Sequence, residues 1–322
     1  EEAHSSELPV DDVTIGGAFT PVFQPDHYLT GRVVRNRRWR VDFNGIGTPW
    51  GCITIRKTPE VLGLLQQDSL GQAREFAGSI EPSMLERAMS WAYLSETEGS
   101  FAIERETPSP SRADAFVALL KAASRSGGSL SEQRLCELQN AIVTNPMDHA
   151  FEYRGQQNYL KGPGRGALAV TYVPPAPDLA GRLTDQIIGL INDPPAGLPP
   201  LVLAAAASFG FVFAHPFMDG NGRLSRYLMH HVIAQSGQLP KAASQSLMLP
   251  ISMAMKRHEG QYLAALEKFS RGARELCQVR WIDEGNYDFT WIEGADIAFR
   301  YWDATDQTVF TLRMAQIALE QD

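Results

Sequence analysis

The chain has little cysteine. Its 322 residues include only Cys52, Cys136 and Cys277, which lie far apart and form no Cys-x-x-Cys pair. An odd, scattered set of this kind excludes a disulfide scaffold and gives no spacing suited to a zinc site. The pattern therefore predicts a protein of the reducing cytoplasm.

A hydrophobic run long enough to cross a membrane is also missing. The longest apolar stretch runs from Leu201 to Ala214 and is interrupted by Ser208 and Gly210, so it is shorter than the ~20 residues that span a bilayer. Residues 1–7 are polar and acidic, unlike a secretory signal. We therefore expect no membrane partner and interpret the apolar stretch as a core helix.

The sequence has no overall excess of positive charge. Its net charge is −8 and its pI is near 5.4, which argues against nucleic acid as the main partner. A local basic cluster does occur, formed by Arg35, Arg37, Arg38 and Arg40. This cluster is either a solvated strand face or a docking surface for a partner.

The most informative segment is residues 215–226, which read His-Pro-Phe-Met-Asp-Gly-Asn-Gly-Arg-Leu-Ser-Arg. Pro216, Gly220 and Gly222 disfavour a helix, so a loop is predicted from His215 to Gly222. Good helix formers follow from Arg223 to about Gln235. The segment therefore predicts a loop that leads into the amino terminus of a helix.

Such a helix start can hold a polyphosphate. Its free backbone N–H groups and the helix dipole favour an anion. Arg223 and Arg226 are three residues apart, so they share a helix face and can contact successive phosphates. Asp219 supplies an oxygen ligand suited to Mg²⁺. His215 titrates near neutral pH and can accept a proton from a hydroxyl group.

The string resembles the core motif of the Fic family, His-Pro-Phe-x-Asp/Glu-Gly-Asn-Gly-Arg-x-x-Arg, at every fixed position. The resemblance covers roughly residues 80–275 and implies transfer of AMP from Mg-ATP to a protein hydroxyl. In that family the related Doc kinases carry Lys where this chain has Gly222, and the glycine favours nucleotidyl transfer over phosphorylation. Phe217 is expected to anchor the loop in the core.

The resemblance also implies a role for each motif residue. His215 would be the general base, and Asp219 would hold the Mg²⁺ that bridges the α- and β-phosphates. The remaining positions would bind ATP phosphates: Gly220, Asn221 and Gly222 as an anion hole, Arg223 at the α- and β-phosphates, and Arg226 at the γ-phosphate.

Residues Ser100–Arg105 resemble the family's inhibitory motif, Ser/Thr-x-x-x-Glu-Gly/Asn. The resemblance implies that Glu104 pairs with Arg226 and blocks the γ-phosphate, since a carboxylate competes with phosphate for the same donors. Arg105 departs from the usual Gly or Asn. Glu98 with Gly99 is a neighbouring candidate for the inhibitory glutamate, but its spacing from Ser95 differs from that of the motif. The alternative without an inhibitory role is that Glu104 is a solvated residue at a helix end.

Two further segments bear on substrates. Residues 155–173 contain a Gly/Pro-rich turn followed by an extended run, which predicts a β-hairpin. In the resemblance this is the flap along which an unidentified target protein docks by strand addition, although a purely structural hairpin is compatible with the same pattern. Tyr262 matches a family aromatic beside the adenine pocket, but an aromatic at helical spacing is more often a core residue.

The whole pattern predicts a mostly α fold, a Fic-type helical bundle with a β-hairpin flap beside the active-site loop. We divide it into an N-terminal arm with a helical extension (1–80), a Fic core (81–275) and a C-terminal extension (276–322). Helices are expected over residues 59–74, from 82 to about 97 or beyond, from an N-cap at Ser111 to about 124, and over 178–191, 199–213, 250–269 and 305–321. Residues 277–302 are expected to be irregular or to form short strands.

The sequence leaves alternatives to AMP transfer. A Fic-type enzyme could use another nucleotide donor or remove AMP from a protein. A regulatory module could sense nucleotide without turnover, although an intact His215 argues against this because sensing needs no base. Assembly into a homodimer is left open.

Overall fold

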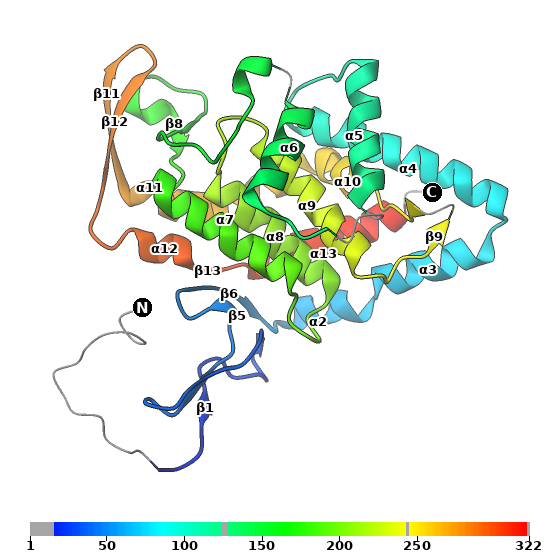
Figure 1. Ribbon diagram of the computed structural model, residues 1–322, viewed down its shortest axis with the longest axis horizontal. Coiled ribbons are helices and arrows are strands. Elements are labelled where there is room, and N and C mark those ends of the chain that lie inside the picture. Colours follow the sequence, from blue (N-terminus) through cyan, green and yellow to red (C-terminus); the bar gives the residue numbers. More distant parts are fainter. Residues whose placement is uncertain (1–15, 124–127, 144, 243–244, 321–322) are drawn as a thin grey trace.

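The computed structural model describes residues 16–123, 128–143, 145–242 and 245–320, most of which lie in helices (Figure 1). The predicted mostly α fold is confirmed. The expectation that residues 1–7 form no secretory signal falls outside the described residues. Among those described, no helix combines the length and the apolar character needed to cross a bilayer.

Helix α8 (Pro200–Ala214) lies at the centre of the body. Nearly all of its side chains are buried, because α7 (Pro177–Asn192), α9 (Asn221–Gln235) and α13 (Thr305–Glu320) pack around it. A helix that is apolar on all sides belongs inside a protein, so the predicted core helix is confirmed. Its carboxyl end delivers the chain directly to His215.

Helix α4 (Pro82–Ile103) packs along α10 (Ile251–Arg257), α5 (Pro110–Ala123) and α9. Helix α6 (Glu132–Ile142) packs on the motif helix α9, and α11 (Glu259–Glu275) packs on α10 and α13. The carboxyl end of α4 therefore lies close to the amino end of α9, although the two are more than a hundred residues apart in sequence.

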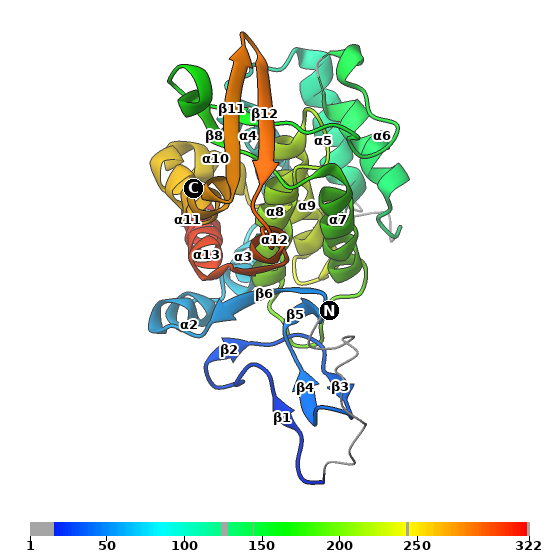
Figure 2. The same cartoon turned by 90° about the vertical axis from the view of Figure 1, so that its left-hand side faces the viewer.

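The amino-terminal segment forms small sheets below the helices (Figure 2). Strand β4 (Val41–Phe43) lies between β1 (Thr20–Pro21) and β3 (Val34–Asn36). The other strands assemble on β6 (Gly51–Arg56), which pairs with β2 (Tyr28–Leu29), β5 (Ile46–Thr48) and β13 (Tyr301–Asp303). The two segments predicted to flank the core are thus joined in one sheet.

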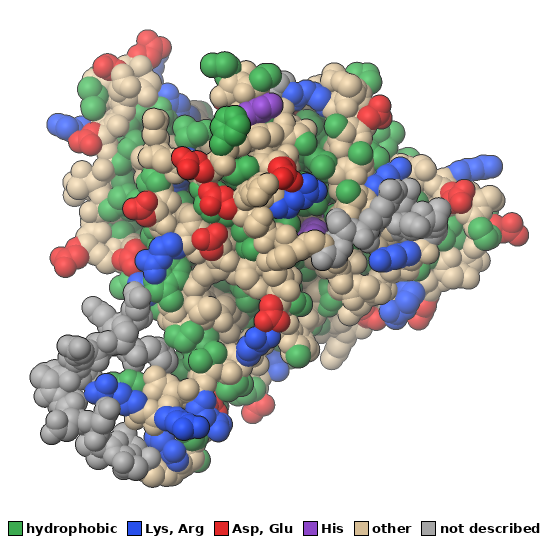
Figure 3. Space-filling view, in the orientation of Figure 1, with side chains coloured by type: hydrophobic (Ala, Val, Ile, Leu, Met, Phe, Trp, Pro, Cys, Tyr) green, Lys and Arg blue, Asp and Glu red, His purple; other side chains and the backbone are tan. Residues whose placement is uncertain are grey.

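The predicted basic cluster spans β3 and the turn that joins it to β4, in the amino-terminal part of the molecule where Lys and Arg side chains gather (Figure 3). Arg35 pairs with Asp42 at 2.8 Å. The guanidinium groups of Arg35 and Arg40 lie 4.0 and 4.2 Å from the ring centroid of Phe19. Stacking on an aromatic ring fixes the positions of these charges.

The predicted flap is a short hairpin. Strand β7 (Leu160–Lys161) pairs antiparallel with β8 (Val170–Tyr172), and the 3-10 turn η2 (Gly166–Ala169) lies between them. A second hairpin, β11 (Cys277–Asp283) with β12 (Asn286–Trp291), projects beside it (Figures 1 and 2). Tyr159 packs on Tyr287 with ring centroids 4.8 Å apart, so the second hairpin supports the flap.

Three expected boundaries are wrong. The helix predicted over 59–74 is two helices, α2 (Pro59–Gln66) and α3 (Ser69–Ser79), because Asp68 adopts a φ of 46° and caps α3 through Gly71 N–H. The helix predicted over 250–269 is divided at His258 into α10 and α11. Helix α5 begins at Pro110, where proline suits the first turn, so Ser111 is not its N-cap.

Of the two expectations for residues 277–302, irregular structure or short strands, the structure shows short strands. Beyond the β11–β12 hairpin, the short helix α12 (Asp296–Arg300) leads into β13. The partly buried Tyr287 and Phe289 on β12 pack against the flap, which gives the hairpin the apolar support that a two-stranded ribbon needs.

Candidate active site

The motif loop is shorter than predicted. Helix α8 ends at Ala214, His215 adopts a left-handed conformation with φ 51°, and α9 begins at Asn221 rather than at Arg223. Gly220 is the N-cap residue of α9 with φ 84°, a conformation that glycine adopts without steric cost. The loop proper is therefore residues 215–220, and Gly222 lies in the first turn of the helix.

The side chain of Asn221 holds the loop closed. Its Oδ1 accepts from the N–H of Phe217 at 3.0 Å, and its Nδ2 donates to the carbonyl of Phe217 at 2.7 Å. Phe217 is buried against Phe211 and Tyr153, as expected for a core anchor. Asn221 can therefore face an anion only through its backbone N–H.

Three polar side chains that the sequence did not single out also fix the loop. Buried Arg154 donates from Nε to the carbonyl of His215 at 2.8 Å. Asn158 donates to the carbonyl of Phe217 at 3.1 Å, and Gln139 to that of Asp219 at 3.2 Å. Burial lowers the pKa of Arg154 to about 10. The three side chains come from other segments of the chain, and no local sequence pattern marks them as loop contacts.

His215 has the geometry of a proton acceptor. It is 7% exposed, and its Nδ1 lies 3.1 Å from the carbonyl oxygen of Val212. Because a carbonyl only accepts, Nδ1 carries the hydrogen and Nε2 keeps a lone pair. Burial lowers the pKa of His215 to about 4; the hydrogen bond to Val212 opposes this shift and Arg154 adds to it. The ring is therefore neutral at physiological pH.

Arg226 binds two residues of the predicted inhibitory motif. Its Nε donates to Ser100 Oγ at 2.9 Å, and its Nη2 donates to the carbonyl of Ser100 and to Glu104 Oε1, both at 2.7 Å. A Cβ added to Gly222 would lie 2.0 Å from Glu104 Oε1. The carboxylate thus lies against the first turn of α9, whereas the neighbouring candidate Glu98 is exposed.

The backbone conformation of Arg105 accounts for the Gly or Asn that is usual at this position of the inhibitory motif. Helix α4 ends with hydrogen bonds from Arg105 N–H to the carbonyl of Ala102 at 3.0 Å and from Glu106 N–H to that of Phe101 at 3.1 Å. This is a Schellman motif, which needs a left-handed residue at its turn. Arg105 supplies it with φ 60°, where Gly or Asn would do so with less strain.

Arg223 and Asp219 lie together beside the loop. Arg223 Nη2 is 3.2 Å from Asp219 Oδ2, and Arg223 Nη1 is 2.8 Å from Oε2 of Glu106. The contact with Glu106 was not predicted. Asp219 also accepts from Gly220 N–H at 2.6 Å and keeps 44% of its side chain exposed.

The carboxylate of Asp219 fits one kind of metal site. Within the described residues there is no group of three or more His, Cys, Asp or Glu side chains arranged to hold a metal ion. Mg²⁺, however, is commonly bound through one or two carboxylates, with phosphate and water as its other ligands. An exposed single carboxylate beside an anion site suits a metal that arrives with a nucleotide.

Tyr262 lies in the core. Its ring is buried and its centroid lies 6.0 Å from that of Phe209 and 5.8 Å from that of Phe310. Burial raises its pKa, Arg226 lowers it and Glu104 raises it. Its hydroxyl therefore faces the Arg226–Glu104 pair, while its ring packs among other aromatics.

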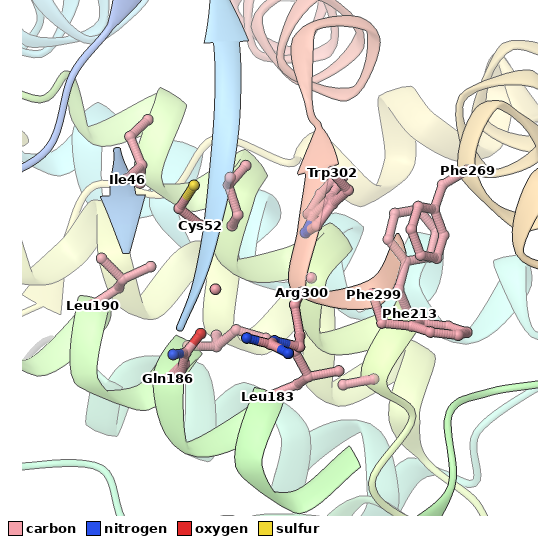
Figure 4. Close-up of a pocket in the computed structure, with 15 residues that line it drawn as sticks. Ile46, Cys52, Leu183, Gln186, Leu190, Phe213, Phe269, Phe299, Arg300 and Trp302 are labelled. Carbon is pink, nitrogen blue, oxygen red and sulfur yellow. The ribbon is translucent and has the colours of Figure 1, made fainter. Parts of the chain in front are cut away.

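A separate cavity lies beneath β6 and β13 (Figure 4). Leu183, Phe213, Phe269 and Trp302 line it, with Arg300 at one side. Its volume of about 30 Å³ holds roughly one water molecule. It is therefore not a candidate for a nucleotide.

Comparison with known proteins matches the segment that carries the motif. Residues 129–233 match the model of the Fic/DOC family. A protein adenylyltransferase Fic of Nematostella vectensis is 39% identical over 70 residues, which is 21% of this chain and 16% of that protein. The corresponding protein of Drosophila virilis is 37% identical over 90 residues, 28% of this chain and 17% of that protein.

A solved structure of a Fic family protein from Desulfovibrio desulfuricans G20 has a similar fold. The TM-score is 0.58 at 17% identity, and the match covers 82% of this chain and 74% of that one. This likeness shows that the Fic fold extends through most of the chain. The chain spans about a sixth of the length of the curated relatives that it matches.

Proposed function

This chain contains a domain of the Fic/DOC family, and from that premise we propose that it transfers AMP from ATP to a Ser, Thr or Tyr hydroxyl of a target protein and of itself. The observation that carries the proposal is a neutral, buried His215 held one loop away from the phosphate-binding end of α9. Relatives named protein adenylyltransferase support the class of reaction.

The reaction follows from the lone pair on His215 Nε2. The target hydroxyl transfers its proton to Nε2, and its oxygen attacks the α-phosphorus of ATP. The bond between that phosphorus and the oxygen bridging to the β-phosphate breaks, and pyrophosphate leaves. The first-turn amides of α9 and the two arginines stabilise the phosphate charge.

Asp219 would hold the Mg²⁺ that accompanies ATP. The metal supplies positive charge that offsets the charge on the phosphates. An Asp219 carboxylate that held the metal would no longer pair with Arg223, whose Nη2 would then be available to donate to a phosphate.

Glu104 would keep the activity low. Its carboxylate accepts a hydrogen bond from Nη2 of Arg226 and lies against Gly222. It would thereby occupy the position of the γ-phosphate. A phosphate and a carboxylate compete for the same guanidinium, so transfer requires that Glu104 move away.

The target would dock along residues 155–173. Within the described chain, β7 and β8 pair only with each other, so the flap retains strand edges to which an extended target segment can add by main-chain hydrogen bonds. Residence in a reducing cytoplasm and assembly into a homodimer stay predictions.

The first test is incubation with ATP labelled on the α-phosphate, in the presence of Mg²⁺. The wild type, Glu104→Gly and Glu104→Gly/His215→Ala are compared for label on protein. We expect strong self-labelling only in Glu104→Gly, because that variant frees Arg226 and keeps the base.

Three other results would change the assignment. Equal labelling of the wild type and Glu104→Gly would show that Glu104 is not the brake. Labelling that survives His215→Ala would remove the base from the mechanism. Absence of label in every variant, with ATP still bound, would favour another nucleotide donor, AMP removal or a sensing module.

A further inference from the structure

A second carboxylate from the inhibitory segment lies on the other motif arginine. Glu106 Oε2 is 2.8 Å from Arg223 Nη1. The Arg223 side chain is 1% exposed, whereas that of Glu106 is 37% exposed. Removing the anionic partner of a buried guanidinium is costly. Arg223 can therefore leave Glu106 only if another anion, such as a phosphate, takes the place of the carboxylate.

The turn at Arg105 brings both carboxylates to α9. Glu104 is the C-cap residue of α4, directly before the left-handed Arg105, and Glu106 follows directly after it. The Glu106 N–H is fixed to the carbonyl of Phe101, so its position is set by the helix end. The two glutamates are two residues apart, and the arginines they meet are three residues apart on one helix face.

Arg223 has both of its terminal nitrogens engaged in this state. Nη1 donates to Glu106 and, at 3.4 Å, to the carbonyl of Ile142, while Nη2 donates to Asp219. Turning Asp219 to a metal would free only Nη2. A phosphate that is to be gripped by both nitrogens must also displace Glu106.

We propose that Glu106 is a second inhibitory carboxylate, which competes with the nucleotide phosphates for Arg223. The inference rests on the proposed function, because it is the phosphate-binding role of Arg223 that makes the contact inhibitory. Residues 104–106 then act as one unit that covers both arginines. Glu104→Gly alone removes the carboxylate from Arg226 and leaves the carboxylate of Glu106 on Arg223.

Nucleotide affinity tests the competition without relying on turnover. Mg-ATP binding is measured by calorimetry for His215→Ala and for the same protein carrying Glu106→Gln, Glu106→Ala, Glu104→Gly or Glu104→Gly/Glu106→Gln. We expect each Glu106 substitution to tighten binding about tenfold, and the double substitution to exceed Glu104→Gly by a similar factor. Glu98→Gln, on the exposed face of α4, is the matched control and should change nothing.

Unchanged affinity in both Glu106 variants would overturn the inference. Weaker binding in both would overturn it too, because it would show that Glu106 orients Arg223 for phosphate. Both substitutions are needed because Glu106→Gln keeps the size of the native side chain, while Glu106→Ala removes every contact that the side chain makes. Melting temperatures close to that of the parent confirm that each variant is folded.

Self-labelling separates this inference from the proposed function. With His215 intact, Glu104→Gly/Glu106→Gln should label several-fold faster than Glu104→Gly. Tighter ATP binding without label in any variant would refute AMP transfer and leave the competition standing. If Glu104→Gly is labelled, and adding Glu106→Gln neither speeds the labelling nor tightens ATP binding, only the inhibitory role of Glu106 is refuted. Absence of ATP binding in every variant would contradict both.

Discussion

At the scale of single residues, His215 takes its properties from the backbone around it. The Val212 carbonyl fixes the hydrogen on Nδ1, and the carbonyl of His215 itself is held by Arg154. These contacts orient the ring, and burial, which lowers the pKa of His215, keeps it neutral before any substrate arrives. A base prepared in this way needs no reorganisation at the moment of proton transfer.

The pH dependence of transfer should reveal this preparation. Burial lowers the pKa of His215 to about 4, and a base must be unprotonated to act. For Glu104→Gly we therefore expect kcat/KM, which reports the free enzyme, to be flat from about pH 8 to about pH 5 and to fall only near pH 4. A profile with its acidic limb near the ordinary histidine value of about 6.5 would contradict the assignment.

The sequence pattern located the residues that lie next to one another in the chain. Of those that meet through the fold, it gave Glu104 with Arg226 by family resemblance and missed the others. His215, Asp219, Arg223 and Arg226 follow from one contiguous string, because helix periodicity and turn chemistry place them together. Glu106 meets Arg223 across 117 positions, and Arg154 lies 61 positions from His215. Only the packing of α4 and of the flap segment on the motif brings these partners into reach.

At the scale of elements, α4 is held firmly enough to position Glu104. Glu96 is fully buried in its middle, and its Oε2 accepts from the N–H of Ser252 at 2.7 Å in the first turn of α10. A Cβ on Gly99 would lie 2.4 Å from the backbone nitrogen of Met253. Because α4 can neither slide nor rotate without breaking these contacts, release of Glu104 is more readily achieved by unwinding its last turn.

The last turn of α4 carries strain that can be removed. Arg105 adopts φ 60°, which costs an ordinary residue of the order of 1 kcal/mol relative to glycine. Arg105→Gly should therefore raise the free energy of unfolding by about 0.5–1 kcal/mol, partly offset by the greater freedom of glycine in the unfolded chain. Denaturation in urea measures the change.

The control is Arg105→Ala, which loses the same side chain and keeps the strained conformation, so it should bring no gain. A loss of stability in the glycine variant would show that the arginine side chain, and not the backbone, matters at this position. Because the Schellman hydrogen bonds remain, self-labelling of Arg105→Gly should stay as low as that of the wild type.

Elements were predicted best where the composition of a contiguous run decides them. The central α8 and the motif helix α9 follow from long apolar or helix-favouring runs. The break at Asp68 depends on a left-handed aspartate that caps α3, and the one at His258 on the change of direction from α10 to α11. Such interruptions depend on what the helices pack against, and the residues around them are acceptable helix formers.

At the scale of the whole molecule, early and late segments of the chain pair in one sheet and pack on each other. Strand β6 pairs in parallel with β13 across about 250 residues of sequence, and α13 packs on both α2 and α8. The terminal segments thus support the helix that delivers His215. A disturbance of the sheet can therefore reach the motif loop through α8, even though no strand of that sheet contributes a residue to the site.

Two buried histidines couple the stability of the protein to pH. Burial lowers the pKa of both His215 and His231 to about 4, and His231 stacks on Tyr227 with centroids 6.0 Å apart. In the unfolded chain a histidine titrates near 6.5. Between about pH 6.5 and about pH 4 the unfolded state therefore binds more protons than the native state, so the free energy of unfolding falls as the pH is lowered.

Urea denaturation at about pH 7 and about pH 5 should show this loss, amounting to a few kcal/mol for the two histidines together. His231→Gln removes one of the two groups and should reduce the loss by about half, whatever its effect at neutral pH. His149→Gln, at an exposed position, is the matched control and should leave the loss unchanged. If His231→Gln showed the full wild-type loss, other groups would govern the acid sensitivity, and the buried ring of His231 would have no part in it.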